Sequence, residues 1–277
     1  MSLLTQDQIC QQIIQAHHDL IVQQPLVHCI TNHVASNYVA NVLLAAGASP
    51  AMIDNPHEAA AFASVSAALS INLGTPTEQQ MQAIPLAIQA AKQQQRPWVL
   101  DPVGYGAVLH WRSHMVDQLL DLHPQVIRGN ASELSALAGQ QIESKGVDAS
   151  VASEQVYQHC LGLLAYSDCV AISGAADYIL WGAQHCLVRV DGGSALQPRI
   201  TATGCALGAL IAAYCAVAEV GIATIAAHAH FAIAAQLAAQ QHQHLGHFAV
   251  AFMDHIQSLD AQQLQSHLKL HLSPLKD

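Results

Sequence analysis

The stretch Arg199-Ile200-Thr201-Ala202-Thr203-Gly204-Cys205-Ala206-Leu207-Gly208 joins a small polar turn to an apolar segment that ends near Ala218. Residues 201–204 suit a tight backbone turn, and apolar residues between 207 and 217 recur at helical spacing. The pattern therefore predicts that Cys205 lies in the first turn of a helix. Because first-turn N–H groups are unpaired and carry partial positive charge, this turn suits a phosphate or a developing oxyanion beside the thiol. A buried structural cysteine behind an ordinary turn is the alternative interpretation.

Composition indicates a chain with a large apolar core. Of its 277 residues, 52% are hydrophobic and only 10% are charged. We expect a single domain over residues 1–277. The uncharged segment from Ala202 to Ala218 approaches the length of a membrane span, but it is rich in alanine and also contains Gly, Thr, Cys and Tyr. That composition favours a helix buried on all sides.

Charge and cysteine usage limit the expected partners and compartment. The formal net charge is −10, and Lys and Arg form no cluster. Nucleic acid and anionic membranes both require local positive charge, so neither is expected as a partner. The seven cysteines include no C-x-x-C pair, and the N-terminus has no basic region followed by an apolar core. These features predict a reduced, cytoplasmic protein.

The 18 histidines raise the question of a metal site, but none falls in an H-E-x-x-H motif. Five of them lie in a Gln-rich helical region, namely His228, His230, His242, His244 and His247. We interpret these five as solvated or pH-buffering residues on helix surfaces.

Strand and helix patterns alternate along most of the chain. Residues 1–24 read as an amphipathic helix that Pro25 ends. Strands are predicted at 26–30, 50–53, 69–73, 98–101, 126–127 and 169–174, with helices at 34–46, from about 77 to 94, and at 151–165. An edge hairpin is predicted from 178–181 and 186–190, and helix from 205 to about 272. Alternation of this kind indicates a largely parallel sheet covered on both faces, hence an α/β/α sandwich.

Polar residues follow several of the predicted strands. Asp101 ends one strand and precedes a Gly-rich loop, and in open α/β sheets such loops form the ligand crevice. A turn-initiating role is the alternative for Asp101. Asn32 follows strand 26–30, where it is either a ligand contact with Asn37 and Asn41 or a helix cap.

The segment Arg128-Gly129-Asn130-Ala131-Ser132-Glu133 leads from a strand into a helix and has two interpretations. Asn130 with Glu133 three residues later fits a variant of the capping box. Alternatively, Arg128 and Glu133 at one strand end serve a nucleotide and its metal.

Taken with residues 101–104, 128–133 and 201–205, the chain resembles the hydroxyethylthiazole kinases of the ribokinase-like superfamily. The resemblance runs across nearly the whole sequence. It also includes Asn32-His33-Val34, residues 37–41, Gly47-Ala48-Ser49-Pro50-Ala51-Met52, Asn72-Leu73-Gly74-Thr75 and Gly146-Val147-Asp148.

This resemblance implies transfer of the ATP γ-phosphoryl group to the hydroxyl of 5-(2-hydroxyethyl)-4-methylthiazole, with Mg²⁺ and a homotrimeric assembly. It implies the following roles: Met52, Ala202, Asn32 and Val34 for the thiazole alcohol, Arg128 and Ser173 for ATP, Thr203, Gly204 and Cys205 for an anion hole, and Asp101 and Glu133 for the metal. Cys205 stands where ribokinase-like relatives carry a catalytic Asp, so we expect it to lie nearest the acceptor hydroxyl as a weak proton acceptor. A helix N-terminus lowers a thiol pKa, which predicts some thiolate at neutral pH, whereas the negative charge of ATP acts in the opposite direction.

Three positions depart from the family pattern. The family usually has Gly at the place of Ala202, and a positive φ there would strain an alanine. Ser173 stands in place of an expected Thr and keeps the hydroxyl. Trp181 replaces an expected Asp before Gly182, a change expected to affect the hairpin rather than the chemistry.

The sequence is also compatible with other functions of the same fold. They are a kinase for hydroxymethylpyrimidine or pyridoxal, and an ATP-dependent hydrate dehydratase, which is a lyase. A third class is a non-enzymatic thiazole- or nucleotide-binding module. The co-occurrence of Asp101, Glu133 and the anion-binding turn argues against that class.

Overall fold

The structure is a computed structural model that describes residues 3–139 and 153–275. Its helices are α1 (Gln6–Gln23), α2 (Ser36–Ala45), α3 (Ala59–Val65), α4 (Glu78–Gln93), α5 (His110–Leu120), α6 (Ala131–Leu137), α7 (Ser153–Cys160), α8 (Thr203–Cys215), α9 (Val220–Gln241), α10 (Leu245–Ser258) and α11 (Ala261–His267). Short 3₁₀ turns lie at Ala107–Leu109, Leu161–Ala165, Gly182–Gln184 and Gln197–Arg199. The motif at 146–148 lies outside the described residues.

Within the described residues, nine strands form one sheet in the order β2-β1-β3-β4-β5-β6-β7-β8-β9. They are β1 (Leu26–Ile30), β2 (Ser49–Ala51), β3 (Ala68–Asn72), β4 (Trp98–Asp101), β5 (Val126–Asn130), β6 (Cys169–Ser173), β7 (Asp177–Trp181), β8 (Cys186–Val190) and β9 (Leu270–Pro274). The first six strands in this order pair in parallel, and the last three join antiparallel. All six parallel strands therefore place their carboxyl ends at the same edge of the sheet.

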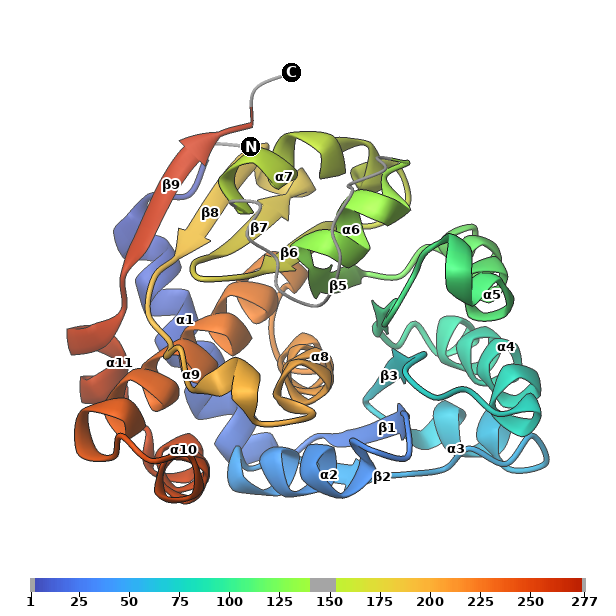
Figure 1. Ribbon diagram of the computed structural model, residues 1–277, viewed down its shortest axis with the longest axis horizontal. Coiled ribbons are helices and arrows are strands. Elements are labelled where there is room, and N and C mark those ends of the chain that lie inside the picture. Colours follow the sequence, from blue (N-terminus) through green and yellow to red (C-terminus); the bar gives the residue numbers. More distant parts are fainter. Residues whose placement is uncertain (1–2, 140–152, 276–277) are drawn as a thin grey trace.

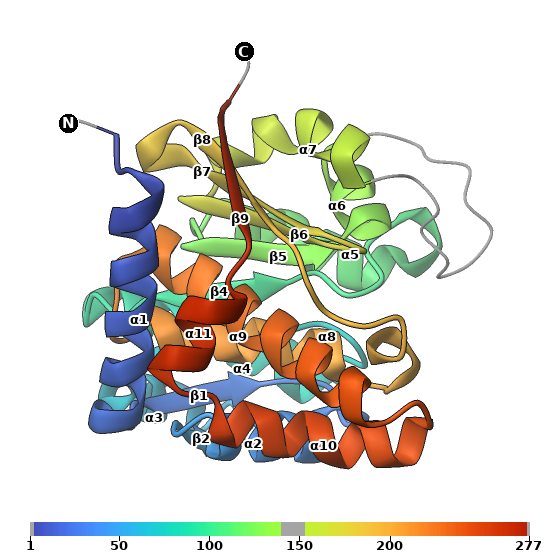
Figure 2. The ribbon, with the colours of Figure 1, turned by 90° about the vertical axis from the view of Figure 1, so that its left-hand side faces the viewer.

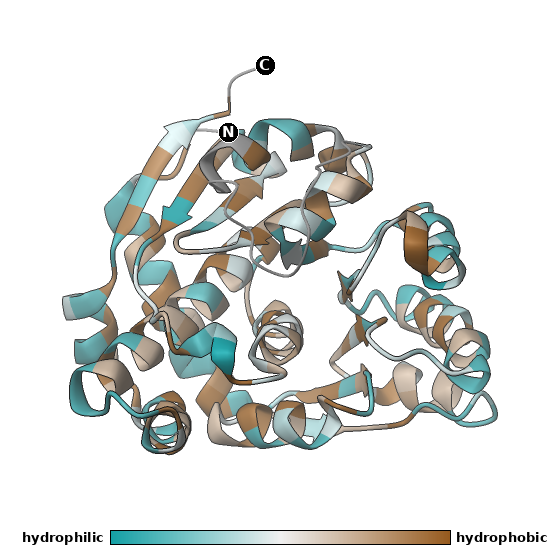
Figure 3. Cartoon of the chain, viewed as in Figure 1, coloured by the Kyte–Doolittle hydropathy of each residue, from teal (hydrophilic) through white to brown (hydrophobic). Residues whose placement is uncertain are grey.

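Helices cover both faces of this sheet, as Figures 1 and 2 show. One apolar core joins the sheet to α1, α2, α8, α9, α10 and α11, and a second core joins its other face to α3, α4, α5, α6 and α7. In Figure 3, brown apolar segments run along the strands and the inner helix faces, and teal segments lie outward. The predicted α/β/α sandwich with a largely parallel sheet is thus confirmed.

The antiparallel end of the sheet differs from the prediction in two respects. Strand β9 pairs with β8, so the β7–β8 hairpin is not at the sheet edge. The chain after Cys205 is therefore not helical throughout, because residues 270–274 form the last strand. Trp181, the residue that departs from the family pattern, is buried in β7 against Gly221 at the start of α9.

Two helices of this fold, α8 and α9, are strongly apolar. Helix α8 contains the predicted buried segment after Cys205. Helix α9 is long and apolar enough to span a membrane by composition, but 83% of its apolar window is buried inside the protein. Both helices therefore belong to the interior of this fold.

The interpretation of the five clustered histidines as solvated is wrong for two of them. His228 and His230 are 0% and 1% exposed, because α9 is packed between the sheet and other helices. Their ring nitrogens bond to Asp177, Tyr214 and the Ile256 carbonyl. By contrast, His244 and His247 are exposed and His242 is half-buried, as predicted for surface residues.

Candidate active site

Polar side chains at the carboxyl ends of neighbouring strands form a continuous row of hydrogen bonds. Nδ2 of Asn32, just after β1, lies 2.7 Å from Oδ1 of Asn72 at the end of β3. Nδ2 of Asn72 donates at 2.8 Å to Oδ2 of Asp101, the last residue of β4. The same Asn32 amide lies 3.4 Å from the Cys205 sulfur in α8. We call Cys205, Asn32, Asn72, Asp101, Arg128 and Ser173 together the strand-end row.

Arg128 extends the row across β5 to β6. Its guanidinium donates at 3.2 Å to Oδ2 of Asp101 and at 3.0 Å to the hydroxyl of Ser173. The charged side chains of Arg128 and Asp101 are 8% and 1% exposed, so this ion pair is almost fully removed from water. A cation held this rigidly at a strand end suits an anionic ligand, because its position costs no rearrangement on binding.

The ionisation of the Asp101–Arg128 pair follows from its contacts. Burial raises the pKa of the Asp101 carboxyl, and Glu133 adds to the rise, whereas Arg128 opposes it. Burial lowers the pKa of Arg128, but Asp101 and Glu133 outweigh burial and raise it. A raised pKa favours the neutral carboxyl of Asp101 but the charged guanidinium of Arg128. Because Asn72 and Arg128 both donate to the same carboxylate oxygen, we assign the pair as ionised.

The turn before α8 adopts the conformation that strains an alanine. Ala202 is the N-cap of α8 with φ of 70°, in the left-handed region where glycine is favoured. No side chain within the described residues caps this helix end, whereas α1, α4, α6 and α11 each carry a capping box. The hydroxyl of Thr203 instead donates to backbone carbonyls of the turn. Within the described residues, the first N–H groups of α8 therefore have no capping side chain as a partner.

Gly204 allows α8 to lie directly against Arg128. A Cβ at position 204 would sit 3.0 Å from both terminal nitrogens of the guanidinium. The close approach places the positive N-terminus of α8 beside the buried cation. The positive end of the α8 helix dipole and the Arg128 guanidinium therefore lie side by side.

The expected thiolate character of Cys205 is wrong for this structure. Burial, and next the charge of Asp101, raise the pKa of the thiol, while Arg128 and the amides of Asn32 and Asn72 act in the opposite direction. The desolvation of the half-buried sulfur outweighs the helix N-terminus. At neutral pH Cys205 is therefore a thiol rather than a thiolate.

Glu133 makes the capping box that was one of its two interpretations. Its carboxylate accepts from the backbone N–H of Asn130 at 3.0 Å, and Asn130 accepts from the N–H of Glu133 at 2.9 Å. The second carboxylate oxygen of Glu133 accepts from Gly104 N at 2.9 Å, which ties the loop after β4 to α6. The capping geometry leaves each oxygen with further acceptor capacity.

The remaining residues named for the acceptor lie around the strand ends of β1 and β2. Met52 follows β2 and is half-buried against the core, and Val34 lies in the turn before α2 with 61% exposure. Asn37 and Asn41 do not join the strand-end row, because they are exposed on α2 and bond to each other.

Asn72 is a site residue that sequence reasoning missed. It belongs to the segment Asn72-Leu73-Gly74-Thr75 that the chain shares with the family, but it was predicted only as part of a buried strand and was given no role at the site. Only the register of β3 and β4, which pairs Asn72 with Asp101, reveals its place in the row.

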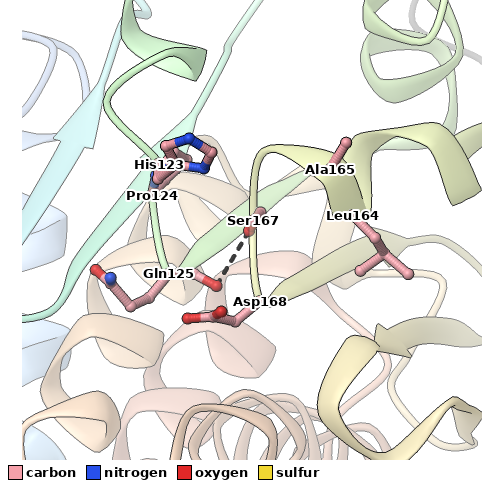
Figure 4. A pocket seen from close by; sticks show the side chains of 7 residues that line it. All are labelled: His123, Pro124, Gln125, Leu164, Ala165, Ser167 and Asp168. Carbon is pink, nitrogen blue, oxygen red and sulfur yellow. Dashed lines mark hydrogen bonds between the residues drawn. The ribbon is translucent and has the colours of Figure 1, made fainter.

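A separate cavity of about 250 Å³ lies at the opposite edge of the sheet. It is lined by residues 123–125 before β5 and by Leu164, Ala165, Ser167 and Asp168 before β6. Figure 4 shows Ser167 directed at the Gln125 carbonyl, to which it donates at 3.1 Å. Because ligands of open α/β sheets bind outside the carboxyl ends of the strands, the strand-end row rather than this cavity is the candidate active site.

The fold is that of the ribokinase-like phosphotransferases. The family model described as "Hydroxyethylthiazole kinase family" matches residues 18–262. The chain belongs to this family. It is 57% identical over 264 residues to a hydroxyethylthiazole kinase of Acinetobacter baumannii (strain ACICU), covering 95% of this chain and 96% of the relative. Identity to that of Acinetobacter baylyi is 59% over 260 residues, covering 94% and 95%.

Solved structures agree with this assignment. A hydroxyethylthiazole kinase from Pyrococcus horikoshii superposes with a TM-score of 0.85 and 31% identity, covering 95% of this chain and 99% of that one. A pyridoxal kinase from Staphylococcus aureus in complex with AMP-PCP and pyridoxal gives 0.60 and 14%, covering 90% and 99%, which shows the shared fold alone. The hydroxymethylpyrimidine kinase, pyridoxal kinase and dehydratase alternatives are therefore not favoured.

Proposed function

We propose that the chain transfers the γ-phosphoryl group of ATP to the hydroxyl of 5-(2-hydroxyethyl)-4-methylthiazole, at the carboxyl ends of β1, β3, β4, β5 and β6. The observation that carries the proposal is the strand-end row itself, in a chain that matches hydroxyethylthiazole kinases over almost its whole length. The row ends in a buried cation and a hydroxyl at Ser173, and begins at a thiol beside an uncapped helix N-terminus.

On the nucleotide side, Arg128 and Ser173 bind ATP phosphates, and the first N–H groups of α8 form the anion hole. The anion hole comprises Thr203, Gly204 and Cys205. It is supported by the absence of a capping side chain in the described part of the chain and by the contact of Gly204 with Arg128. Phosphoryl transfer needs positioning and charge stabilisation more than covalent chemistry, which these fixed groups supply.

Mg²⁺ fits the acidic residues of the site. Oδ1 of Asp101 is buried without a partner among the described residues, and Glu133 lies close enough for its charge to raise the Asp101 pKa. Those residues contain no group of three or more His, Cys, Asp or Glu side chains able to hold a metal. Mg²⁺ commonly takes one or two carboxylates and completes its shell with phosphate oxygens and water. Asp101 and Glu133 would hold it, and when bound it neutralises charge on the phosphates.

On the acceptor side, Cys205 lies nearest the acceptor hydroxyl. The thiazole alcohol is a small, largely apolar heterocycle, which suits walls made by Met52, Val34 and the backbone at Ala202. Asn32 contributes a polar contact, and its amide already lies 3.4 Å from the Cys205 sulfur. Because the transition state is loose, the reaction needs little help from a proton acceptor, so a side chain that is mostly thiol and only to a small fraction thiolate is sufficient.

We also propose that the whole chain is one cytoplasmic kinase domain that assembles as a homotrimer with each site at a subunit boundary. One continuous sheet across the described residues supports the single domain. The seven cysteines are all free, which agrees with a reducing compartment. Val34, a proposed wall of the acceptor pocket, is 61% exposed in a single chain, and a neighbouring subunit would cover it.

The function is tested by ADP release from ATP and Mg²⁺ with four acceptor conditions. These are the thiazole alcohol, hydroxymethylpyrimidine, pyridoxal and no acceptor. We expect release that depends on the thiazole alcohol. Release driven equally by pyridoxal or hydroxymethylpyrimidine would contradict the proposal.

A further inference from the structure

A buried histidine and a carboxylate form a close pair directly behind the nucleotide side of the strand-end row. Nδ1 of His228, in the middle of α9, lies 2.7 Å from Oδ2 of Asp177, the first residue of β7. The His228 side chain is 0% exposed and that of Asp177 is 17% exposed. Because an ionised carboxylate only accepts, Nδ1 of His228 carries the proton in this contact.

Asp177 also closes the tight turn between β6 and β7. Its other oxygen, Oδ1, accepts from the backbone N–H of Gly174 at 3.0 Å. Gly174 directly follows Ser173, whose hydroxyl accepts from Arg128 at 3.0 Å. The carboxylate of Asp177 therefore connects α9 to the backbone that carries Ser173. Gly174 and Ala175 at the tip of this turn are exposed, so contacts within the chain are what hold its shape.

The pair is connected to the buried cation through the turn, because Arg128 donates to Ser173 and Asp177 accepts from the N–H of the next residue, Gly174. After burial, which lowers the pKa of Arg128, the charges that raise it include that of Asp177. Helix α9 packs on β6, β7 and β8 (Figure 2). The contact with Asp177 at the start of β7 places His228 at the same edge of the sheet as Ser173. The second ring nitrogen of His228 is buried with no partner among the described residues, so the contact with Asp177 is the polar contact that fixes the ring.

We propose that Asp177 and His228 are positioning residues for the nucleotide, acting through the turn that carries Ser173. The inference rests on the proposed assignment of Arg128 and Ser173 to ATP. Within the described residues, the hydrogen bonds of the pair join Asp177 to His228 and to Gly174, whereas the acceptor side at Asn32 and Cys205 lies at the other end of the row. Loss of the pair should therefore weaken nucleotide binding and leave the acceptor side unchanged.

Helix α9 offers a matched control two residues away. His230 is equally buried, and its ring bonds to Tyr214 at 2.9 Å and to the Ile256 carbonyl at 2.8 Å, away from the strand-end row. A His→Leu change at either position removes a buried ring with its polar contacts. Both should lower thermal stability, but only position 228 should affect the nucleotide.

The test is calorimetric titration of ADP with Mg²⁺ into the wild type and variants, without acceptor. We expect His228→Leu to raise the Kd for ADP about 10-fold, because misplacement of a binding group weakens its contact steeply. His228→Asn should stay within about 3-fold of the wild type, since the Asn amide nitrogen occupies the place of Nδ1 and still donates. His230→Leu should leave the Kd unchanged. In steady-state assays His228→Leu should raise KM for ATP and leave KM for the acceptor unchanged.

Asp177→Ala keeps the test valid if His228→Leu does not fold, because Asp177 is partly exposed. We expect a rise in Kd at least as large, because this change removes both the His228 contact and the Gly174 hydrogen bond. Adding His228→Leu to Asp177→Ala should give no further rise, since the contact between the two side chains is already lost. An unchanged Kd in Asp177→Ala, or equal Kd values in His228→Leu and His230→Leu, would overturn the inference. The titration contains no acceptor, so its result does not depend on which alcohol the enzyme phosphorylates. A failure to phosphorylate the thiazole alcohol is therefore distinguishable from an ADP affinity that does not depend on Asp177 and His228. A wild type that does not bind ADP overturns both.

Discussion

Asn72 and Asp101 occupy paired positions at the ends of adjacent parallel strands, and the Asn72 amide donates to the Asp101 carboxylate at 2.8 Å. The opposite side of the same amide group accepts from Asn32, which in turn contacts the Cys205 sulfur. Asn72 is therefore the residue that connects the acceptor side of the strand-end row to its nucleotide side.

Replacement of this connecting residue should reduce turnover. Asn72→Leu keeps a similar branched shape but removes the hydrogen bonds to Asn32, Asp101 and the Gly74 N–H, which leaves Asp101 and Asn32 free to shift. We expect kcat/KM for the thiazole alcohol to fall about 10- to 100-fold, as for loss of a group that orients reacting residues. Asn41→Ala is the control, because Asn41 bonds only to Asn37 on an exposed helix face. If Asn72→Leu and the wild type had equal kinetics, the hydrogen bonds of the strand-end row would contribute to packing and not to catalysis.

Glu133 should contribute to metal use as well as to the helix cap. Glu133→Gln can accept only one of the two backbone hydrogen bonds that the carboxylate accepts, from Gly104 and Asn130. We expect a stability loss of about 1–2 kcal/mol and a higher Mg²⁺ concentration for half-maximal rate.

Asn130→Ala separates the two roles of Glu133. It removes the other half of the capping box, the bond from the Glu133 N–H, while the Glu133 carboxylate stays. We expect a similar loss of stability with unaltered Mg²⁺ dependence. If both variants change Mg²⁺ dependence equally, or neither does, Glu133 is a cap alone.

His230 in α9 packs edge-on against His17 in α1, and both rings are buried. Burial of His230 should make the fold sensitive to acid. Burial, and next the neighbouring His17, lower the pKa of His230 to about 3, while its bond to the Ile256 carbonyl acts the other way. His230 therefore takes up a proton near pH 6.5 in the unfolded chain but only near pH 3 in the folded chain. Stability is therefore lost as pH falls through this window, by about 2 kcal/mol between pH 6.5 and pH 5.

Denaturant unfolding at pH 7.5 and pH 5 measures this contribution. The wild type should lose stability on acidification, and His230→Leu should lose about 2 kcal/mol less because it lacks the titrating group. The variant is less stable at both pH values, so the comparison concerns the difference between them. A wild type and variant with the same pH dependence would show that His230 is not the acid-sensitive group.

Cys205 should assist the reaction without being essential to it. General-base assistance is typically worth about 10²–10⁴-fold, whereas the anion hole consists of backbone groups that a side-chain change leaves in place. We expect Cys205→Ala to lower kcat by at most about that range with ATP affinity nearly kept. Cys205→Asp should remain active, because a carboxylate is a stronger proton acceptor than the neutral thiol. Wild-type turnover in Cys205→Ala would show that the thiol does not take part in the reaction. Complete loss of turnover in both variants, with the fold intact, would indicate a covalent or structural role for the thiol.

Local sequence patterns identified the elements that continuous apolar runs define. Strands 26–30 and 98–101 lie where they were predicted, because each is a short apolar run bounded by Pro or polar residues. The C-terminal strand was missed because Leu270–Pro274 is short, half-exposed and ends in proline. Its partner is β8, far away in the chain, and local periodicity carries no information about such a pairing.

The site could be predicted only where chemistry stands out from its surroundings. Asp101 and Arg128 were recognisable because a charge at the end of an apolar strand is unusual, and Cys205 because a polar turn leads into its apolar helix. The roles of these three residues were implied by the family resemblance. Asn72 and His228 were not, since their roles follow from strand register and helix packing. The pKa of Cys205 was likewise predicted in the wrong direction, because burial of the sulfur depends on how α8 meets the sheet.

The central claim is that the strand-end row transfers the γ-phosphoryl group of ATP to the thiazole alcohol. It is tested most directly by quantifying ADP, inorganic phosphate and phosphorylated thiazole alcohol in one reaction by phosphorus NMR. We predict one phosphorylated alcohol for each ADP formed, with no release of inorganic phosphate. ADP accompanied by an equal amount of inorganic phosphate, with no phosphorylated alcohol, would contradict the claim.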